Sequence, residues 1–119
     1  MRVLVVEDDG VVRGLALRML SGLGYTVLEA ADGRAGLDVA ARHGGRLDLL
    51  LTDMVMPGAS GRDVARQVSA LHGTVRVVYM SGYTDGEISH AGMLEPGALF
   101  LQKPFTRDTL ARIVREALD

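Results

Sequence analysis

The chain has 119 residues, of which 48% are hydrophobic and 24% charged, and its formal net charge is -2. This length predicts a single domain spanning residues 1–119, and the near-neutral charge shows no basic excess of the kind that nucleic-acid-binding proteins carry. The lack of cysteine excludes disulfides and thiolate metal sites, and no apolar stretch suits a membrane span or a signal peptide, so we expect a cytoplasmic protein.

The first part of the chain predicts alternating strands and helices. A continuous apolar run at residues 3–6 is typical of a strand buried on both faces of a sheet. An apolar stripe over residues 12–23, spaced as one helical face and followed by Gly24, predicts a helix. Residues 25–29 mix polar and apolar side chains, which predicts a strand near a sheet edge, and a shorter helix is expected around residues 37–41.

The middle of the chain continues this alternation. Apolar runs at residues 49–51 and 77–80 predict two more buried strands. Between them, Ser60 is expected to cap a helix that continues to Leu71.

The last part of the chain completes the pattern. Residues 84–97 contain three glycines and a proline, and they predict only a short, weakly held helix. A strand is expected at residues 98–101, followed by a helix that Thr106 caps and that runs to residue 118. Five consecutive strand–helix units predict an α/β fold with a parallel sheet and helices on both faces.

Charged and polar side chains follow the predicted strands, where ligands bind in an open parallel sheet. They are Glu7, Asp8 and Asp9 after the first run, Thr52 and Asp53 after the third, Ser81 and Gly82 after the fourth, and Lys103 after the fifth. Some have simpler explanations, since Asp9 suits a helix cap and Ser81 suits a turn. Two carboxylates about 4 Å apart repel by roughly 4 kcal/mol at an effective dielectric near 20, so such a cluster either raises pKa values or holds a cation. With oxygen ligands alone, Mg²⁺ is the natural candidate.

Lys103 is the only lysine among 13 basic residues, and it directly precedes Pro104. Arginine is a broad planar fork, whereas lysine is a compact charge on a flexible stem. The use of lysine rather than arginine at position 103 is either chance or reflects the need for a small cation in a tight place.

Four segments resemble the signature blocks of response-regulator receiver domains of two-component signalling. They are residues 4–9 (LVVEDD), residues 50–58 (LLTDMVMPG) with Gly61 following, residues 80–83 (MSGY) and residues 102–105 (QKPF). The blocks occur in the family's order and spacing, and the resemblance covers essentially the whole chain. It implies a flavodoxin-like (βα)5 fold with a five-stranded parallel sheet of order 2-1-3-4-5.

The resemblance implies a role for each matching residue. Asp53 would accept the phosphoryl group as an acyl phosphate. Asp8 and Asp53, with the backbone carbonyl of Val55, would ligate Mg²⁺, and Glu7 would contribute to this site directly or through a water molecule; Mn²⁺ could substitute for Mg²⁺. Lys103 would pair with the phosphoryl oxygens.

The resemblance also implies how the phosphoryl group is sensed. Ser81 would be the switch hydroxyl, Phe100 the switch aromatic ring, and residues 84–97 the segment that changes shape. The peptide bond between Lys103 and Pro104 would be cis, which would aim the lysine inward.

The function implied is a phosphorylation-activated signalling switch that turns over no metabolite. It would take the phosphoryl group from a sensor histidine kinase or a histidine phosphotransfer protein, and relay it by conformational change or onward transfer. Residues 77–85 resemble the receivers attached to hybrid sensor histidine kinases more than they resemble the receivers of transcription factors. If the domain comes from such a hybrid protein, the parent chain would be a kinase. Output would pass to a partner, or to a second copy of the chain, through the fourth helix, the strand at residues 98–101 and the last helix, without direct contact with nucleic acid or membrane.

Several residues depart from the family pattern. Ser81 and Phe100 stand where many members have threonine and tyrosine. Val55 occupies a position that in the family influences hydrolysis of the acyl phosphate, and a valine cannot orient water, so we predict slow self-dephosphorylation. Tyr83 is a second position of this kind and could shield the site. The histidines at positions 43, 72 and 90 lack metal-ligand spacing and are expected at the surface.

Two other functions compete with this interpretation. An aspartate-nucleophile phosphohydrolase of the haloacid-dehalogenase type needs a second acid two residues after the nucleophile, and Val55 at that position disfavours it. A flavin carrier of flavodoxin type would need a phosphate-binding loop after the first strand. The acidic loop found there would repel phosphate unless a metal intervenes.

Overall fold

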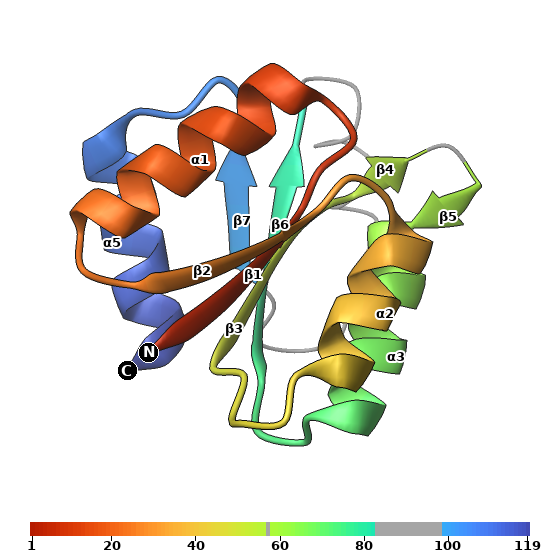
Figure 1. The fold of residues 1–119 in the computed structure, drawn as a ribbon. Helices are drawn as coiled ribbons and strands as arrows, with labels where there is room; N and C mark the ends of the chain where they lie inside the picture. Colours follow the sequence, from red (N-terminus) through yellow and green to blue (C-terminus); the bar gives the residue numbers. More distant parts are fainter. Residues whose placement is uncertain (57, 83–98) are drawn as a thin grey trace.

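The computed structural model describes residues 1–56, 58–82 and 99–119 (Figure 1). Its five-stranded parallel sheet consists of β1 (Arg2–Val6), β2 (Thr26–Ala30), β3 (Leu49–Asp53), β6 (Arg76–Ser81) and β7 (Leu99–Gln102), in the order β2-β1-β3-β6-β7. Counted along the chain, these five strands have the order 2-1-3-4-5, which confirms the predicted topology and puts the mixed strand β2 at an edge. The helix expected within residues 84–97 and Tyr83 lie outside the described residues.

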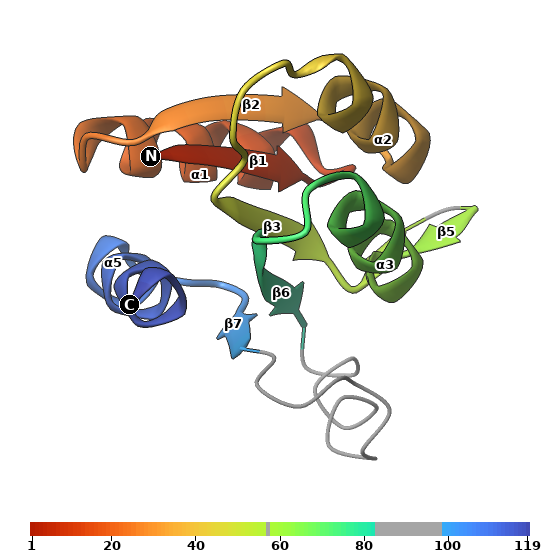
Figure 2. The ribbon, with the colours of Figure 1, turned by 90° about the horizontal axis from the view of Figure 1, so that it is seen from below.

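Helices cover both faces of the sheet. The two helices α1 (Gly10–Gly22) and α5 (Arg107–Leu118) lie on one side, and α2 (Gly33–Arg42) and α3 (Gly61–Leu71) lie on the other (Figures 1 and 2). Along β1, Leu4 and Val6 belong to the core on the α2 and α3 side, whereas Val3 and Val5 belong to the core on the α1 and α5 side. All four side chains are fully buried, which explains why the strand reads as a continuous apolar run.

The predicted helix starts are confirmed by side-chain caps. Asp9 accepts hydrogen bonds from the backbone N–H groups of Val11 and Val12 at 2.9 and 3.3 Å. The hydroxyls of Ser60 and Thr106 cap α3 and α5, each accepting from a backbone N–H three residues later at 3.1 Å. Because these bonds satisfy N–H groups that a helix start leaves open, each cap anchors its helix next to the sheet edge that carries the acids.

The structure differs from the sequence prediction in two local features. Strand β3 continues to Asp53, so Thr52 and Asp53 belong to the strand, because their backbone groups still pair with the neighbouring strands. A two-stranded antiparallel sheet, β4 (Val55–Met56) and β5 (Ala59–Ser60), follows it and was not predicted. Strands of two residues leave no periodic pattern that a sequence could reveal.

The expectation that the histidines lie at the surface is wrong for two of them. His43 and His72 are half-buried, with ring centroids 6.1 Å apart. Each follows the last residue of a helix, α2 or α3, and these helices pack together so that their ends meet. The Nε2 atom of His72 lies 2.8 Å from the carbonyl oxygen of Ala40, to which it donates. His90 lies outside the described residues.

Across the described ranges, no helix combines the length and the apolar character that crossing a membrane would require.

Candidate functional site

The carboxyl ends of four strands bring the predicted site residues to one edge of the sheet. Glu7 follows β1 directly, Asp53 is the last residue of β3, and Ser81 is the last residue of β6. Lys103 follows β7 directly. The strand register aligns these ends, since Asp53 pairs with Met80, the residue before Ser81. The sheet therefore brings together residues that are up to 96 positions apart in the chain.

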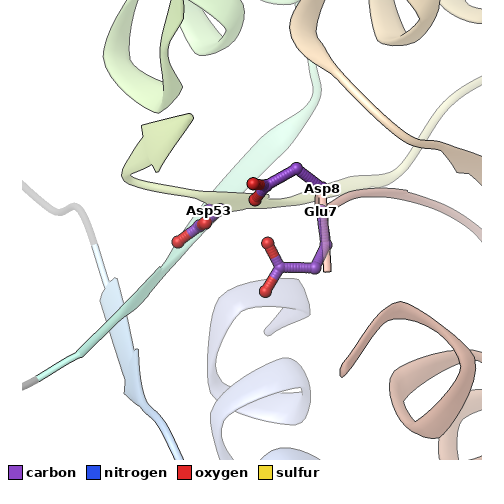
Figure 3. Close-up of side chains that lie close together, drawn as sticks. All are labelled: Glu7, Asp8 and Asp53. Carbon is purple, nitrogen blue, oxygen red and sulfur yellow. The ribbon is translucent and has the colours of Figure 1, made fainter. Parts of the chain in front are cut away.

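Three carboxylates form a compact acidic cluster. One oxygen each from Glu7, Asp8 and Asp53 lies within 4.8 Å of the other two, and Figure 3 shows the side chains of Glu7 and Asp8 pointing toward Asp53. Glu7 and Asp53 are 0% and 4% exposed, whereas Asp8 is exposed. The cluster is therefore open to solvent on the Asp8 side and closed on the other.

Lys103 neutralises part of this acidic cluster. Its Nζ atom donates to Glu7 Oε1 and to Asp53 Oδ1, both at 3.1 Å. Burial acts to lower the pKa of Lys103, but the hydrogen bonds and charges of Glu7 and Asp53 outweigh it and raise the pKa. The peptide bond between Lys103 and Pro104 is cis, as predicted, and the backbone N–H of Lys103 donates to the carbonyl of Ser81 at 2.7 Å. The pairing of Lys103 with Glu7 was not predicted from the sequence.

Glu7 is held in an environment that disfavours its charge. Burial, followed by the neighbouring Asp53, raises the pKa of Glu7 from 4.5 to about 7, although Lys103 opposes the shift. Its Oε2 atom is buried, and among the described residues it has no hydrogen-bond partner. An unsatisfied buried oxygen beside two further carboxylates fits a hard cation, which prefers oxygen ligands. Glu7, Asp8 and Asp53 are thus the side chains that could hold such an ion.

The loop from β1 to α1 is tied to its surroundings by an arginine that sequence reasoning missed. The Nη1 atom of Arg13 donates to the carbonyl oxygen of Glu7 at 2.8 Å. Its Nε atom donates to Oε1 of Glu29 on β2 at 3.2 Å. Nothing in the sequence marks Arg13, which is one of twelve arginines in the chain.

The loop from β3 to α3 depends on a glycine. The backbone N–H of Gly61 donates to the carbonyl of Met54 at 2.7 Å. A Cβ atom at Gly61 would overlap the carbonyl oxygen of Asp53, so the helix can approach the strand this closely only with glycine at this position. Val55, in β4 between β3 and α3, has 56% of its surface exposed. The sequence placed Gly61 within a motif but did not reveal why a glycine is needed.

The sequence and the fold around this site are similar to those of known proteins. The family model of the response regulator receiver domain matches residues 3–115. The chain belongs to the response-regulator receiver family. It is 35% identical over 117 residues to the sensor kinase CckA of Brucella abortus and 30% identical over 118 residues to sporulation initiation phosphotransferase F of Bacillus subtilis. The crystal structure of the receiver domain from the hybrid histidine kinase CckA is 37% identical, covers 100% of both chains and has a TM-score of 0.84.

The relatives differ greatly in length. The alignments cover 98% of this chain in both cases, but only 12% of the sensor kinase and 93% of the phosphotransferase. The chain also spans about half of several transcriptional regulators, such as 48% of the regulatory protein YrkP of Bacillus subtilis. What these proteins share with the chain is the receiver domain, which is a phosphorylation-dependent signalling switch. The comparisons give no support to the phosphohydrolase alternative.

The two predicted switch residues lie on β6 and β7, and the first of them is next to the strand that ends in Asp53. Ser81 is 4% exposed at the end of β6, beside the strand that ends in Asp53. Phe100 lies on β7, half-buried, with its ring 6.0 Å from that of Tyr79. Ser81 and Phe100 therefore occupy neighbouring, hydrogen-bonded strands.

Proposed function

We propose that this receiver domain accepts a phosphoryl group on Asp53 from a phosphohistidine, in a reaction that requires Mg²⁺. The observation that carries the proposal is the acidic cluster of Glu7, Asp8 and Asp53, with Lys103 Nζ 3.1 Å from Asp53 Oδ1. An isolated nucleophilic carboxylate would not need two further acids beside it. A cluster that holds a divalent cation does need them, because phosphoryl transfer brings two anionic groups together.

Different residues of the chain would carry out different parts of the phosphoryl transfer. Lys103 would hold one carboxylate oxygen of Asp53 while the other attacks phosphorus, and the bond from phosphorus to the donor histidine nitrogen would break, leaving its electron pair on the ring. Glu7, Asp8, Asp53 and the carbonyl of Val55 would hold the cation, with Mn²⁺ able to replace Mg²⁺. When bound, the cation supplies positive charge that offsets the repulsion between carboxylate and phosphoryl group.

The response to phosphorylation would involve Ser81 and Phe100. The Ser81 hydroxyl would move toward the phosphoryl group and donate a hydrogen bond to one of its oxygens. The ring of Phe100 would then turn inward, into the space that the hydroxyl leaves. The chain would act as a signalling domain without turning over a metabolite.

The donor would be a sensor histidine kinase or a histidine phosphotransfer protein. The similarity to the hybrid kinase CckA supports the interpretation that the domain serves a hybrid histidine kinase. Output would use the face that includes β7 and α5, toward a partner or a second copy, and we expect no direct contact with nucleic acid or membrane.

The proposal is tested by labelling the purified protein with acetyl phosphate and with a panel of phosphorylated histidine kinases. We expect one phosphoryl group per chain by intact mass spectrometry, dependent on Mg²⁺ and lost in Asp53→Asn. Asp38→Asn, which changes an exposed acid of α2, is the matched control and should label normally. Labelling that persists in Asp53→Asn, or that does not depend on Mg²⁺, would refute the proposal.

A further inference from the structure

Arg13 connects three elements around the acidic cluster. It lies in the first turns of α1, and its side chain is 22% exposed. One nitrogen donates to the carbonyl of Glu7 at 2.8 Å, and another pairs with the carboxylate of Glu29 on β2 at 3.2 Å. We call these two contacts the Arg13 bridge. They use the planar fork of the guanidinium, which presents several donors in fixed directions.

The Arg13 bridge fixes the peptide that precedes Asp8. The carbonyl of Glu7 belongs to the planar peptide group that joins Glu7 to Asp8, so a hydrogen bond to this oxygen sets the orientation of the whole group. On one side of this peptide, the N–H of Glu7 donates to the carbonyl of Ala30 at 3.2 Å. On the other side, Asp9 caps α1. Asp8, the exposed acid of the cluster, follows this peptide directly.

We infer that Arg13 is a positioning residue for the cation site, where it holds the Glu7–Asp8 peptide so that the Asp8 carboxylate faces Glu7 and Asp53. The inference rests on the proposed function, since it concerns the cation that phosphoryl transfer to Asp53 would use. Arg13 touches neither the cation nor the phosphoryl group. It acts through the backbone, as residues outside the ligand set commonly do around metal ions.

A positioning role of Arg13 can be distinguished from a purely electrostatic role, because Arg13 carries a positive charge. A guanidinium near a cation site repels the cation, so its removal should strengthen binding if charge were the whole effect. Loss of the Arg13 bridge should instead weaken binding, because Asp8 would lose its fixed direction. The two explanations predict opposite signs for the same substitution.

The test measures Mn²⁺ binding to the full chain by electron paramagnetic resonance of the free ion, with Mg²⁺ as a competitor. Arg13→Met keeps the length of the stem but removes the fork and the charge, and we expect binding weaker by on the order of tenfold. Arg13→Lys keeps the charge without the fork, and we expect a loss of similar size. Arg18→Met, an exposed arginine of the same helix, is the matched control and should bind as tightly as the wild type or slightly more tightly.

Each outcome decides between the explanations. Tighter binding by Arg13→Met, with wild-type affinity in Arg13→Lys, would show that Arg13 acts only through its charge and would overturn the inference. Thermal melting without divalent cations checks that each variant is folded, and Arg13→Lys serves if Arg13→Met is not. A variant that melts earlier yet binds Mn²⁺ with wild-type affinity would assign Arg13 to stability alone and would also overturn it.

Labelling with acetyl phosphate separates this inference from the proposed function. We expect Arg13→Met to need about tenfold more Mg²⁺ for half-maximal labelling, with a rate at saturating Mg²⁺ close to that of the wild type. If the wild type is not labelled on Asp53, the proposed function fails. If the wild type is labelled and Arg13→Met shows the same Mg²⁺ dependence, the inference about Arg13 fails while the proposed function stands.

Discussion

Glu7 links the stability of the receiver domain to pH. Burial, and then the neighbouring Asp53, raise its pKa from 4.5 to about 7 in the folded chain, against the opposing effect of Lys103. Because the pKa of Glu7 is higher in the folded chain than in the unfolded chain, the folded state binds more protons at any pH between these two pKa values. The stability that protonated Glu7 contributes is therefore complete below about pH 4.5 and is lost as the pH rises through about 7. A span of this size corresponds to about 3 kcal/mol of unfolding free energy.

Glu7→Gln tests this linkage directly. Glutamine keeps the shape of protonated glutamate, can accept from Lys103 and can donate to Asp53, but it does not titrate. We expect the unfolding free energy of the variant to match that of the wild type near pH 4 and to exceed it by up to about 3 kcal/mol near pH 8, without divalent cations. Urea denaturation over this pH range measures the difference. Glu116→Gln, which changes an exposed acid of α5, is the matched control and should not reproduce this increase.

A constant difference between Glu7→Gln and the wild type across the pH range would refute this reasoning. Excess Mg²⁺ provides a second check, because a bound cation favours ionised Glu7 and stabilises the folded state that binds it. We expect Mg²⁺ to reduce the loss of wild-type stability at high pH. It should stabilise Glu7→Gln less, since the neutral amide is a poorer ligand.

Three further predictions concern other parts of the site. Lys103→Arg keeps the charge but replaces a compact cation by a fork, and we expect normal phosphorylation of Asp53 with impaired partner binding; wild-type binding by the phosphorylated variant would contradict this. Val55 should allow an aspartyl phosphate lifetime of minutes or longer, shortened by Val55→Gln, and a wild-type lifetime of seconds in purified protein would show the reasoning to be wrong. Gly61→Ala should lower the unfolding free energy by about 1–3 kcal/mol in urea denaturation, because the methyl group overlaps the Asp53 carbonyl, and unchanged stability would exclude that overlap.

The sequence predicts what depends on local order. Apolar runs mark the inner strands because β1, β3 and most of β6 are buried on both faces, and Ser60 and Thr106 mark helix starts because a cap acts within three residues. The order of the motifs predicts that Asp53 and Lys103 meet, since parallel strands end at one edge of the sheet.

Contacts set by tertiary distance could not be predicted in this way. The pairing of Lys103 with Glu7 joins residues 96 positions apart, and it depends on which strands flank β3 and how far each one reaches. Arg13 reaches Glu29 because the first turn of α1 packs near the end of β2, and no short pattern in the sequence encodes that contact. For the same reason, the close approach at Gly61 becomes visible only when helix and strand are placed together.

The charges of the site explain why its basic side chain is a lysine rather than an arginine. When ionised, Glu7, Asp8 and Asp53 carry three negative charges against one on Lys103, and the difference matches a divalent cation. Conversion of the Asp53 carboxylate to an acyl phosphate moves the negative charge outward onto the phosphoryl oxygens. Lys103 would then lose its partner at Asp53 Oδ1, and its flexible stem allows the ammonium to follow the charge, whereas the fork of an arginine would have to reorient as a whole. Because the backbone N–H of Lys103 donates to the Ser81 carbonyl at 2.7 Å, such a movement would start next to the end of β6, the strand that carries Ser81. We therefore expect the single lysine of this chain to report the state of Asp53 to Ser81 as well as to neutralise it.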